Sequence, residues 1–159
     1  MDFLARLYFT LINSANWLQS LLLLLFRLEW GYQFYATGQG KLDKHAQVVE
    51  FFSSLNIPFP DANAWFVGGV ETVGGALLLL GLATRPVGLI LTVNMIVAYL
   101  AVDEDQAKVL NILYEPDKFL QADPFFFLLT SALVLAFGAG IFSIDAILAR
   151  TVFKKYVVK

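Results

Sequence analysis

The chain has 159 residues, of which 58% are hydrophobic and only 15% are charged, and its mean hydropathy is +0.69. Soluble domains carry about 25% charged residues, so the composition excludes an ordinary soluble protein and indicates one integral membrane domain over residues 1–159. The chain has no cysteine, which excludes disulfides and Cys-ligated metal or haem, and its single histidine excludes a multi-histidine metal site. Its net charge is -2 and it has no basic patch, so nothing indicates nucleic-acid binding.

The first twelve residues alternate apolar and polar side chains at helical spacing. This pattern predicts an amphipathic helix that lies in the membrane interface. The alternative, a cleaved signal peptide, is disfavoured because the segment is weakly charged and no small-residue cleavage site follows the apolar run. Residues 13–16, Asn-Ser-Ala-Asn, should end this helix and cap the next one.

The first membrane span is expected over about residues 17–36, and it carries a charged residue, Arg27, after a long apolar run. Arg27 lies about ten residues into the span, hence near the middle of the bilayer. It either snorkels to the headgroups or pairs with another buried group, and the apolar flanks favour the pair. Glu29 is two positions away and does not share the face of Arg27, so it turns toward water, a ligand cavity or another subunit.

Glycines at 38 and 40 should end this span and begin a long connection. A stripe of Val48, Phe51, Phe52 and Leu55 predicts a short amphipathic helix, which we interpret as a lid over one mouth of the bundle. Lys41 should lie at that outer mouth, and we interpret His45 as an ordinary polar loop residue.

The second span, about residues 62–81, carries a carboxylate, Glu71, near its centre. Glycines at helical spacing surround it and allow a neighbouring helix to approach closely. The link to the third span, about 86–102, is so short that the two must form an antiparallel hairpin. The third span is apolar except for Asn94.

The fourth span is expected over about residues 124–140 and is rich in phenylalanine. Ser143 should cap a last helix over residues 144–156, whose Arg150, Lys154 and Lys155 are typical of a basic helix on an anionic membrane leaflet. The expected fold is therefore all-α: a four-transmembrane-helix bundle with N- and C-terminal amphipathic interfacial helices. The distribution of Lys and Arg favours both termini on the cytoplasmic side and both long connections outside.

Counting residues from the span ends places Arg27, Glu71 and Asn94 at similar depth, so we predict an Arg27–Glu71 pair with the amide of Asn94 beside it. Such a pair either fixes helix register and does nothing else, or borders a polar cavity for a quinone head group or another small ligand. At the inner face, Arg85 and Asp145 are predicted to form a second ion pair that locks the hairpin to the C-terminal helix.

Several segments, taken in order, resemble the DoxX family of small membrane proteins: FRLEWGYQFYATGQGKL, NIPFP, VETVGGALLLLGLATR, the pair Asn94-Met95, and GAGIFSIDA. The resemblance covers about residues 25–148 and implies an all-α four-helix bundle in a prokaryotic plasma membrane. Positions of this chain that match recurrent positions of the family are Arg27, Gly31, Gly38, Lys41, Glu71, Gly75, Arg85, Ser143 and Asp145.

The resemblance implies a link to quinone-dependent oxidation, because members of the family are associated with thiosulfate:quinone oxidation, quinol oxidases and membrane oxidative-stress complexes. We therefore expect a small accessory subunit of a quinone-linked membrane oxidoreductase or respiratory complex, with no intrinsic cofactor and with a quinone or a lipid as the candidate ligand. The alternative is a non-enzymatic scaffold or assembly factor that binds another membrane protein. A solute transporter is disfavoured, since the chain shows no inverted repeat or broken helix.

Overall fold

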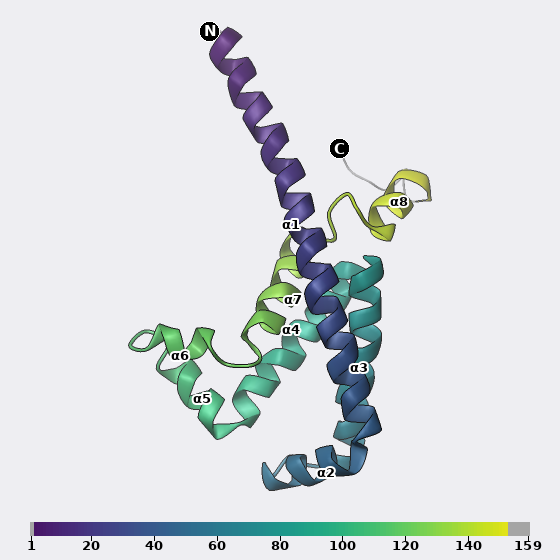
Figure 1. The fold of residues 1–159 in the computed structure, drawn as a ribbon, viewed down its shortest axis with the longest axis vertical. Helices are drawn as coiled ribbons and strands as arrows, with labels where there is room; N and C mark the ends of the chain where they lie inside the picture. Colours follow the sequence, from purple (N-terminus) through teal and green to yellow (C-terminus); the bar gives the residue numbers. More distant parts are fainter. Residues whose placement is uncertain (1, 153–159) are drawn as a thin grey trace.

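The computed structural model describes residues 2–152, and within that range the ordered elements are all helices (Figure 1). Three of them, α1, α3 and α4, are long and apolar enough to cross a membrane. The prediction of an all-α membrane protein is thus confirmed. The helices are α1 (Asp2–Asp43), α2 (His45–Ser54), α3 (Pro60–Leu80), α4 (Thr84–Ala101), α5 (Asp103–Leu110), α6 (Pro116–Leu120), α7 (Phe125–Phe137) and α8 (Ile144–Thr151).

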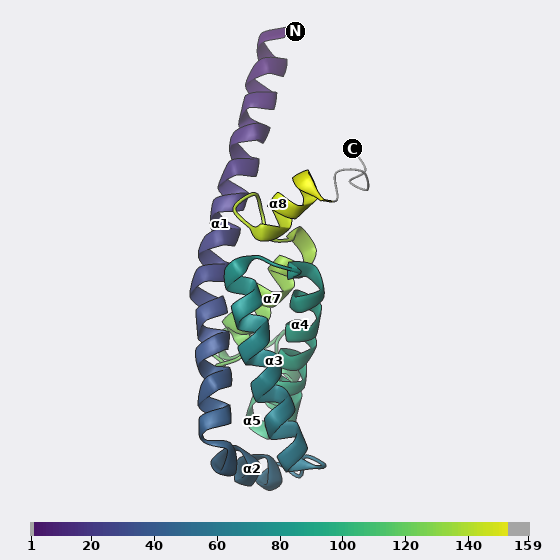
Figure 2. The ribbon, with the colours of Figure 1, turned by 90° about the vertical axis from the view of Figure 1, so that its right-hand side faces the viewer.

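Helix α1 is continuous over 42 residues, so two predicted boundaries within it are wrong. The Asn-Ser-Ala-Asn segment does not end a helix, because residues of these types in a helix interior each cost well under 1 kcal/mol relative to alanine. No separate N-terminal helix forms, and residues 3–19 are exposed along a half of α1 that extends beyond the other helices (Figures 1 and 2).

Gly38, near the end of α1, serves packing and does not break the helix, and Gly40 lies within the helix with open space beside it. A Cβ added at Gly38 would lie 2.4 Å from the backbone nitrogen of Thr72 in α3, and one added at Gly75 would lie 2.4 Å from the backbone nitrogen of Tyr35 in α1. Backbones this close admit only glycine, so the two helices are in direct main-chain contact along this seam. This seam fixes the register of α1 against α3.

The predicted hairpin of α3 and α4 is confirmed. Gly81 ends α3 in the left-handed region with a φ of 65°, and Ala83 adopts a φ of 50° just before α4. Behind this turn, α4 packs against α7 around a core that comprises Phe34, Leu78, Val87, Leu91, Met95 and Val134.

Helix α7 has only 13 residues, a rise of roughly 20 Å, which is less than the roughly 30 Å of a bilayer core. The predicted span over 124–140 is therefore helical only to Phe137. An irregular segment follows, and then Ser143 caps α8 by accepting a hydrogen bond from the backbone nitrogen of Ala146 at 3.1 Å, as predicted. Helix α8 is the described part of the predicted C-terminal helix and ends at Thr151. Residues 153–156 of that prediction, with Lys154 and Lys155, lie outside the described residues.

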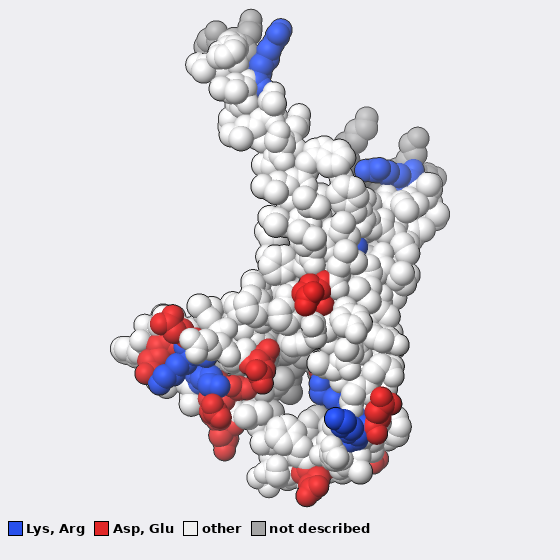
Figure 3. Space-filling view, viewed as in Figure 1, with Lys and Arg blue, Asp and Glu red and all other residues white. Residues whose placement is uncertain are grey.

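The two long connections, between α1 and α3 and between α4 and α7, gather at the end of the molecule opposite α8. Helix α2 runs across the ends of α1 and α3 (Figure 2), and α5 and α6 form a lobe at the same end (Figure 1). Charged side chains concentrate over this end, whereas the broad middle of the surface is almost uncharged (Figure 3). The molecule is hollowed between the α2 end and the lobe, with basic side chains on the α2 side of the hollow and acidic side chains on the lobe side (Figure 3).

Candidate functional site

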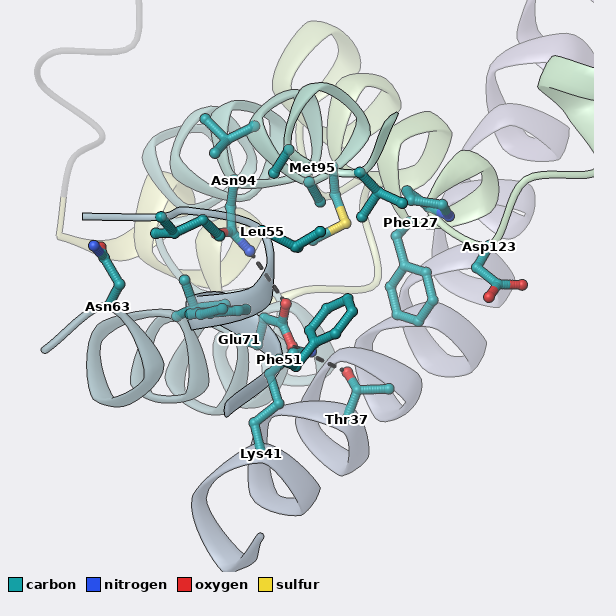
Figure 4. A pocket seen from close by; sticks show the side chains of 18 residues that line it. Thr37, Lys41, Phe51, Leu55, Asn63, Glu71, Asn94, Met95, Asp123 and Phe127 are labelled. Carbon is teal, nitrogen blue, oxygen red and sulfur yellow. Dashed lines mark hydrogen bonds and ion pairs between the residues drawn. The ribbon is translucent and has the colours of Figure 1, made fainter. Parts of the chain in front are cut away.

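Glu71 is the centre of a buried polar cluster in which three helices meet. Its side chain is only 4% exposed, and Lys41 Nζ lies 2.5 Å from its Oε2 atom. Asn94 Nδ2 donates to the other carboxylate oxygen at 3.2 Å, and Thr37 Oγ1 lies 3.3 Å from Oε2. We call these four residues the Glu71 cluster: Thr37, Lys41, Glu71 and Asn94 (Figure 4).

The glycine seam positions this cluster. Gly38 allows α1 to contact α3 directly beside Glu71, since a Cβ there would lie 2.9 Å from the carbonyl carbon of Glu71. Thr37 and Lys41 are four residues apart, so both project from α1 on nearly the same face. The carboxylate thus receives a cation and two neutral polar partners, which offsets the cost of its burial.

A cavity of about 320 Å³ opens beside the cluster. Its polar lining comprises the Glu71 cluster together with Asn63 and Asp123, while the remaining lining is apolar (Figure 4). Sites for small ligands have this character, with apolar walls and a few convergent polar groups, and begin at about 300 Å³. The apolar walls are Phe51, Phe52, Leu55, Ile57, Val67, Met95, Val97, Ala98, Ala101, Val102, Pro124 and Phe127.

Helix α2 forms one wall of this cavity, in agreement with its interpretation as a lid. Phe51, Phe52 and Leu55, three residues of the predicted stripe, all line the cavity. His45 begins α2 and is not a loop residue: its ring stacks on Trp65 of α3 with centroids 4.4 Å apart, and its Nε2 atom lies 3.7 Å from Asp61 Oδ1. These contacts attach the start of the lid to α3.

The structure corrects the predicted pair of Arg27 and Glu71. Arg27 is 1% exposed, and its guanidinium donates to three backbone carbonyls, those of Leu78 at 3.0 Å, Phe142 at 3.1 Å and Ala139. Contrary to the prediction, Arg27 and Glu71 do not lie at the same level, because α1 is displaced along its axis relative to α3. Thr37, which meets Glu71, follows Arg27 by ten residues, or roughly 15 Å of helix.

The predicted ion pair of Arg85 with Asp145 is also absent from the described residues. Asp145 instead accepts hydrogen bonds from the backbone nitrogens of Ala83 at 2.7 Å and Thr84 at 2.8 Å, and from the Thr84 hydroxyl. Arg85 is exposed. A carboxylate at the first turn of a helix satisfies free N–H groups and complements the helix dipole, so Asp145 caps α4 across the chain.

The remaining predicted site residue, Glu29, is separate from the cluster. It is exposed on α1 and accepts a hydrogen bond from Gln33 Nε2 at 3.3 Å. The structure therefore brings together Glu71, Asn94 and Lys41, and leaves Arg27, Glu29, Arg85 and Asp145 outside that group. Within residues 2–152, no group of three or more histidine or carboxylate side chains is arranged to hold a metal ion.

Sequence reasoning missed Thr37 as a partner and placed Lys41 only at the mouth. The available signal was the spacing of these two residues, four apart on the α1 face that carries Gly38. The cluster can bind a small ligand in two ways, because Lys41 and Asn94 offer hydrogen-bond donors and the Glu71 carboxylate offers acceptors.

Comparison with known proteins identifies one family model, DoxX, which matches residues 22–104, more than half of the chain. A curated protein of Bacillus subtilis (strain 168), named "Putative oxidoreductase CatD", is 33% identical over 79 residues. The match covers 50% of this chain and 58% of that protein, so the chain spans little more than half the length of this relative. No solved structure matches.

Proposed function

Because the chain belongs to the DoxX family, we propose that it serves as a small accessory subunit of a quinone-linked membrane oxidoreductase, with the cavity at the Glu71 cluster as the quinone head-group site. A role associated with a membrane oxidoreductase follows from the family and from the name of the relative in Bacillus subtilis. The observation that carries the finer proposal is the Glu71 cavity, which combines a cation, a carboxylate and an amide with apolar walls.

The two redox forms of a quinone ring would use the cluster differently. The carbonyl oxygen of an oxidised ring accepts hydrogen bonds, for which Lys41 Nζ and Asn94 Nδ2 are the donors. The hydroxyl of a reduced ring donates, for which the Glu71 carboxylate is the acceptor. The ring itself would lie against Phe51, Met95 and Phe127, which line the same cavity. The chain has no cysteine, so the proposal places the electron donor on a partner subunit.

The proposal includes a fourth crossing of the membrane by α7 together with the irregular segment that follows it. Irregular backbone is tolerated at membrane depth only where its polar groups are satisfied within the protein. Arg27 provides such partners, because it donates to the carbonyls of Ala139 and Phe142 in this segment. Arg27 thus supports a short fourth span.

We place the domain in a prokaryotic plasma membrane with both termini cytoplasmic. The end that carries α8 and the N-terminus includes Arg6, Arg85 and Arg150, and the sequence after α8 adds Lys154, Lys155 and Lys159. The opposite end carries four lysines, mixed with many acidic residues: Lys41, Lys44, Lys108 and Lys118. An excess of Lys and Arg marks the cytoplasmic side, so the lid and the α5–α6 lobe would face outward.

A second candidate function, a non-enzymatic scaffold or assembly factor, is favoured by the projecting half of α1. Its apolar side chains are exposed over residues 3–19, and such a helix offers a surface to another membrane protein. Co-purification with a flavin- or haem-containing partner is compatible with both functions, so ligand binding must separate them.

The deciding experiment measures binding of a tailless naphthoquinone to the full chain in lipid nanodiscs. We expect saturable binding by the natural chain, and at least about tenfold weaker binding, or about 1.4 kcal/mol, for Lys41→Met and for Glu71→Gln. Lys44→Met is the matched control, because Lys44 is exposed and does not line the cavity. No binding, or equal binding by all four chains, would reject the head-group site and leave the scaffold.

A further inference from the structure

We infer that two copies of this chain pair side by side along α1, through a row of leucines on the face of α1 that points away from its own bundle. The inference goes beyond the proposed function, because it assigns an interaction surface and its partner without using the Glu71 cavity. We call this row the leucine stripe: Leu4, Leu7, Leu11, Leu18, Leu21, Leu25 and Leu28.

The leucine stripe follows a seven-residue repeat. Its first set of positions is seven residues apart, and each of these is followed three residues later by another leucine or, after Leu11, by Ser14. In a heptad abcdefg these are the a and d positions, at which two supercoiled helices meet. The repeat extends over residues 4–28, about three and a half heptads. Residues 21–25 are leucine throughout, so the periodicity is carried by residues 4–18. The a positions are Leu4, Leu11, Leu18 and Leu25.

The contacts of α1 with its own bundle lie on the opposite side of the helix. Ser20, Leu23 and Arg27 are buried, and they occupy c and f positions of the same heptads, which a coiled coil leaves outside its seam. Every leucine of the stripe, in contrast, is 45–70% exposed. Helix α1 can therefore pack against its own bundle with one face and against a second helix with the other.

The bilayer does not cover the whole stripe. Helix α3 has 21 residues and rises roughly 31 Å, the thickness of a hydrocarbon core. Arg27 donates to the carbonyl of Leu78 in the last turn of α3, so it marks one edge of that core. Leu18 and Leu4 precede Arg27 along α1 by roughly 13 Å and 35 Å of helix, in the half that projects beyond the other helices (Figures 1 and 2). An apolar face that extends beyond the hydrocarbon is normally covered by a protein partner.

The stripe is large enough for a specific pair. Burying a leucine is worth about 1.5–3 kcal/mol at about 25 cal/mol per Å², so each leucine presents roughly 60–120 Å². The leucines of two copies would together bury roughly 800–1,700 Å². Specific protein interfaces bury about 1,200–2,000 Å², so the stripe alone supplies an area of the required size.

The pattern favours a second copy as the partner. All copies cross the membrane in the same direction, so two α1 helices would be parallel, and each a or d position would meet its own equivalent across a two-fold axis. Ser14, at a d position, would meet the other Ser14, and a polar residue in the seam fixes the register. The e and g positions flank the seam and carry no charge over residues 4–28, so two identical helices meet no like-charge repulsion there. These flanking residues are Tyr8, Thr10, Ala15, Trp17, Leu22 and Leu24.

The first test uses the absence of cysteine from the chain. Leu11→Cys places a thiol at an a position, and Asn16→Cys, the matched control, places one at an f position on the other side of α1; both residues are exposed. Helix axes 8–10 Å apart bring facing Cα atoms of two helices to roughly 4–6 Å, which a disulfide can span. Each full-length variant is oxidised with copper phenanthroline in the membranes of the expressing cells.

We expect Leu11→Cys to form a disulfide-linked dimer at least about tenfold faster than Asn16→Cys, because only the first thiol lies in the seam. Equal rates would show random collision and would overturn the inference.

The second test measures the mass of the full-length protein in mild detergent by light scattering. The natural chain should be a dimer. Leu11→Lys places like charges across the seam and should raise the dissociation constant of the dimer by at least about tenfold. Asn16→Lys is the matched control and should leave that constant unchanged. Circular dichroism should show the natural helix content in both variants, because both positions are exposed.

A monomeric natural chain, or a dimer that Leu11→Lys does not weaken, would overturn the inference. A monomer that holds a different membrane protein through α1 would also overturn it and would support the scaffold instead. Neither test involves a quinone, so the inference and the proposed head-group site stand or fall separately.

Discussion

Lys41 Nζ and Glu71 Oε2 lie 2.5 Å apart, so a lysine near the end of α1 neutralises a carboxylate on the neighbouring helix α3. Lys41 is 30% exposed and Glu71 only 4% exposed. The pair therefore extends from the accessible end of the bundle toward its interior. It gives α1 and α3 an electrostatic contact beside the main-chain seam that the glycines allow.

Removing the lysine should leave an uncompensated carboxylate. We expect Lys41→Met to lower the free energy of unfolding by about 2–3 kcal/mol, and the double variant Lys41→Met/Glu71→Leu to recover much of that loss. Unfolding by a denaturing detergent, followed by circular dichroism, measures each step of this double-mutant cycle. Losses that simply add would show that the two side chains are not coupled.

Arg27 and Glu71 belong to different sites, so their replacements should behave independently. We expect Arg27→Leu to destabilise the fold by about 3 kcal/mol, because it leaves three carbonyls without their donor. The double variant Arg27→Leu/Glu71→Leu should equal the sum of the two single changes within about 0.5 kcal/mol. The same unfolding assay applies, and partial recovery in the double variant would contradict the arrangement described above.

The sequence was sufficient to predict an all-helical membrane protein and the bounds of two of its long helices. Apolar runs placed α3 and α4 to within two residues at each end, since long hydrophobic segments leave little choice of structure in lipid. The lid was predictable from the stripe Phe51, Phe52 and Leu55. In α1 the local signal gave the wrong boundary. Gly38 was predicted to end the helix, but it lies inside α1 and allows close contact with α3.

The partners of the charged groups were not predictable. Depth counted from span ends assumes that all helices start at the same plane, and the displacement of α1 against α3 violates that assumption. Backbone acceptors leave no trace in the sequence, so the carbonyl partners of Arg27 could not be identified. The same holds for Asp145, whose partners are mainly the N–H groups of Ala83 and Thr84.

Because Asp145 caps α4 and Arg85 does not pair with it, replacing these two residues should have different effects on stability. Asp145→Ala should cost about 1–2 kcal/mol of stability, the usual range for loss of a helix cap. Arg85→Ala should change the free energy of unfolding by less than about 0.5 kcal/mol, because Arg85 is exposed. Thermal unfolding in mild detergent distinguishes these values, and equal losses would instead support an ion pair between the two residues.

The seam between α1 and α3 should tolerate no added methyl group. Gly75→Ala places a Cβ 2.4 Å from the backbone nitrogen of Tyr35, so the helices must separate, at a cost of about 1–3 kcal/mol or more.

Gly69→Ala on the same helix is the control for the seam. It meets nothing within 4 Å and should be neutral or stabilising by up to about 1 kcal/mol. Melting temperatures of the two variants measure the difference. A neutral Gly75→Ala would mean that the two backbones are further apart than described.

The hydrogen bonds of Arg27 also have a consequence for biogenesis. Ribosomes deliver Arg27 to the bilayer long before they synthesise Ala139 and Phe142, whose carbonyls it needs. Throughout that interval the guanidinium lacks two of its three final acceptors, and an unsatisfied cation resists transfer into hydrocarbon. Insertion is therefore complete only when the segment after α7 has been synthesised and its carbonyls bind Arg27. A nascent chain that stalls before this segment should be recognised as incomplete and degraded.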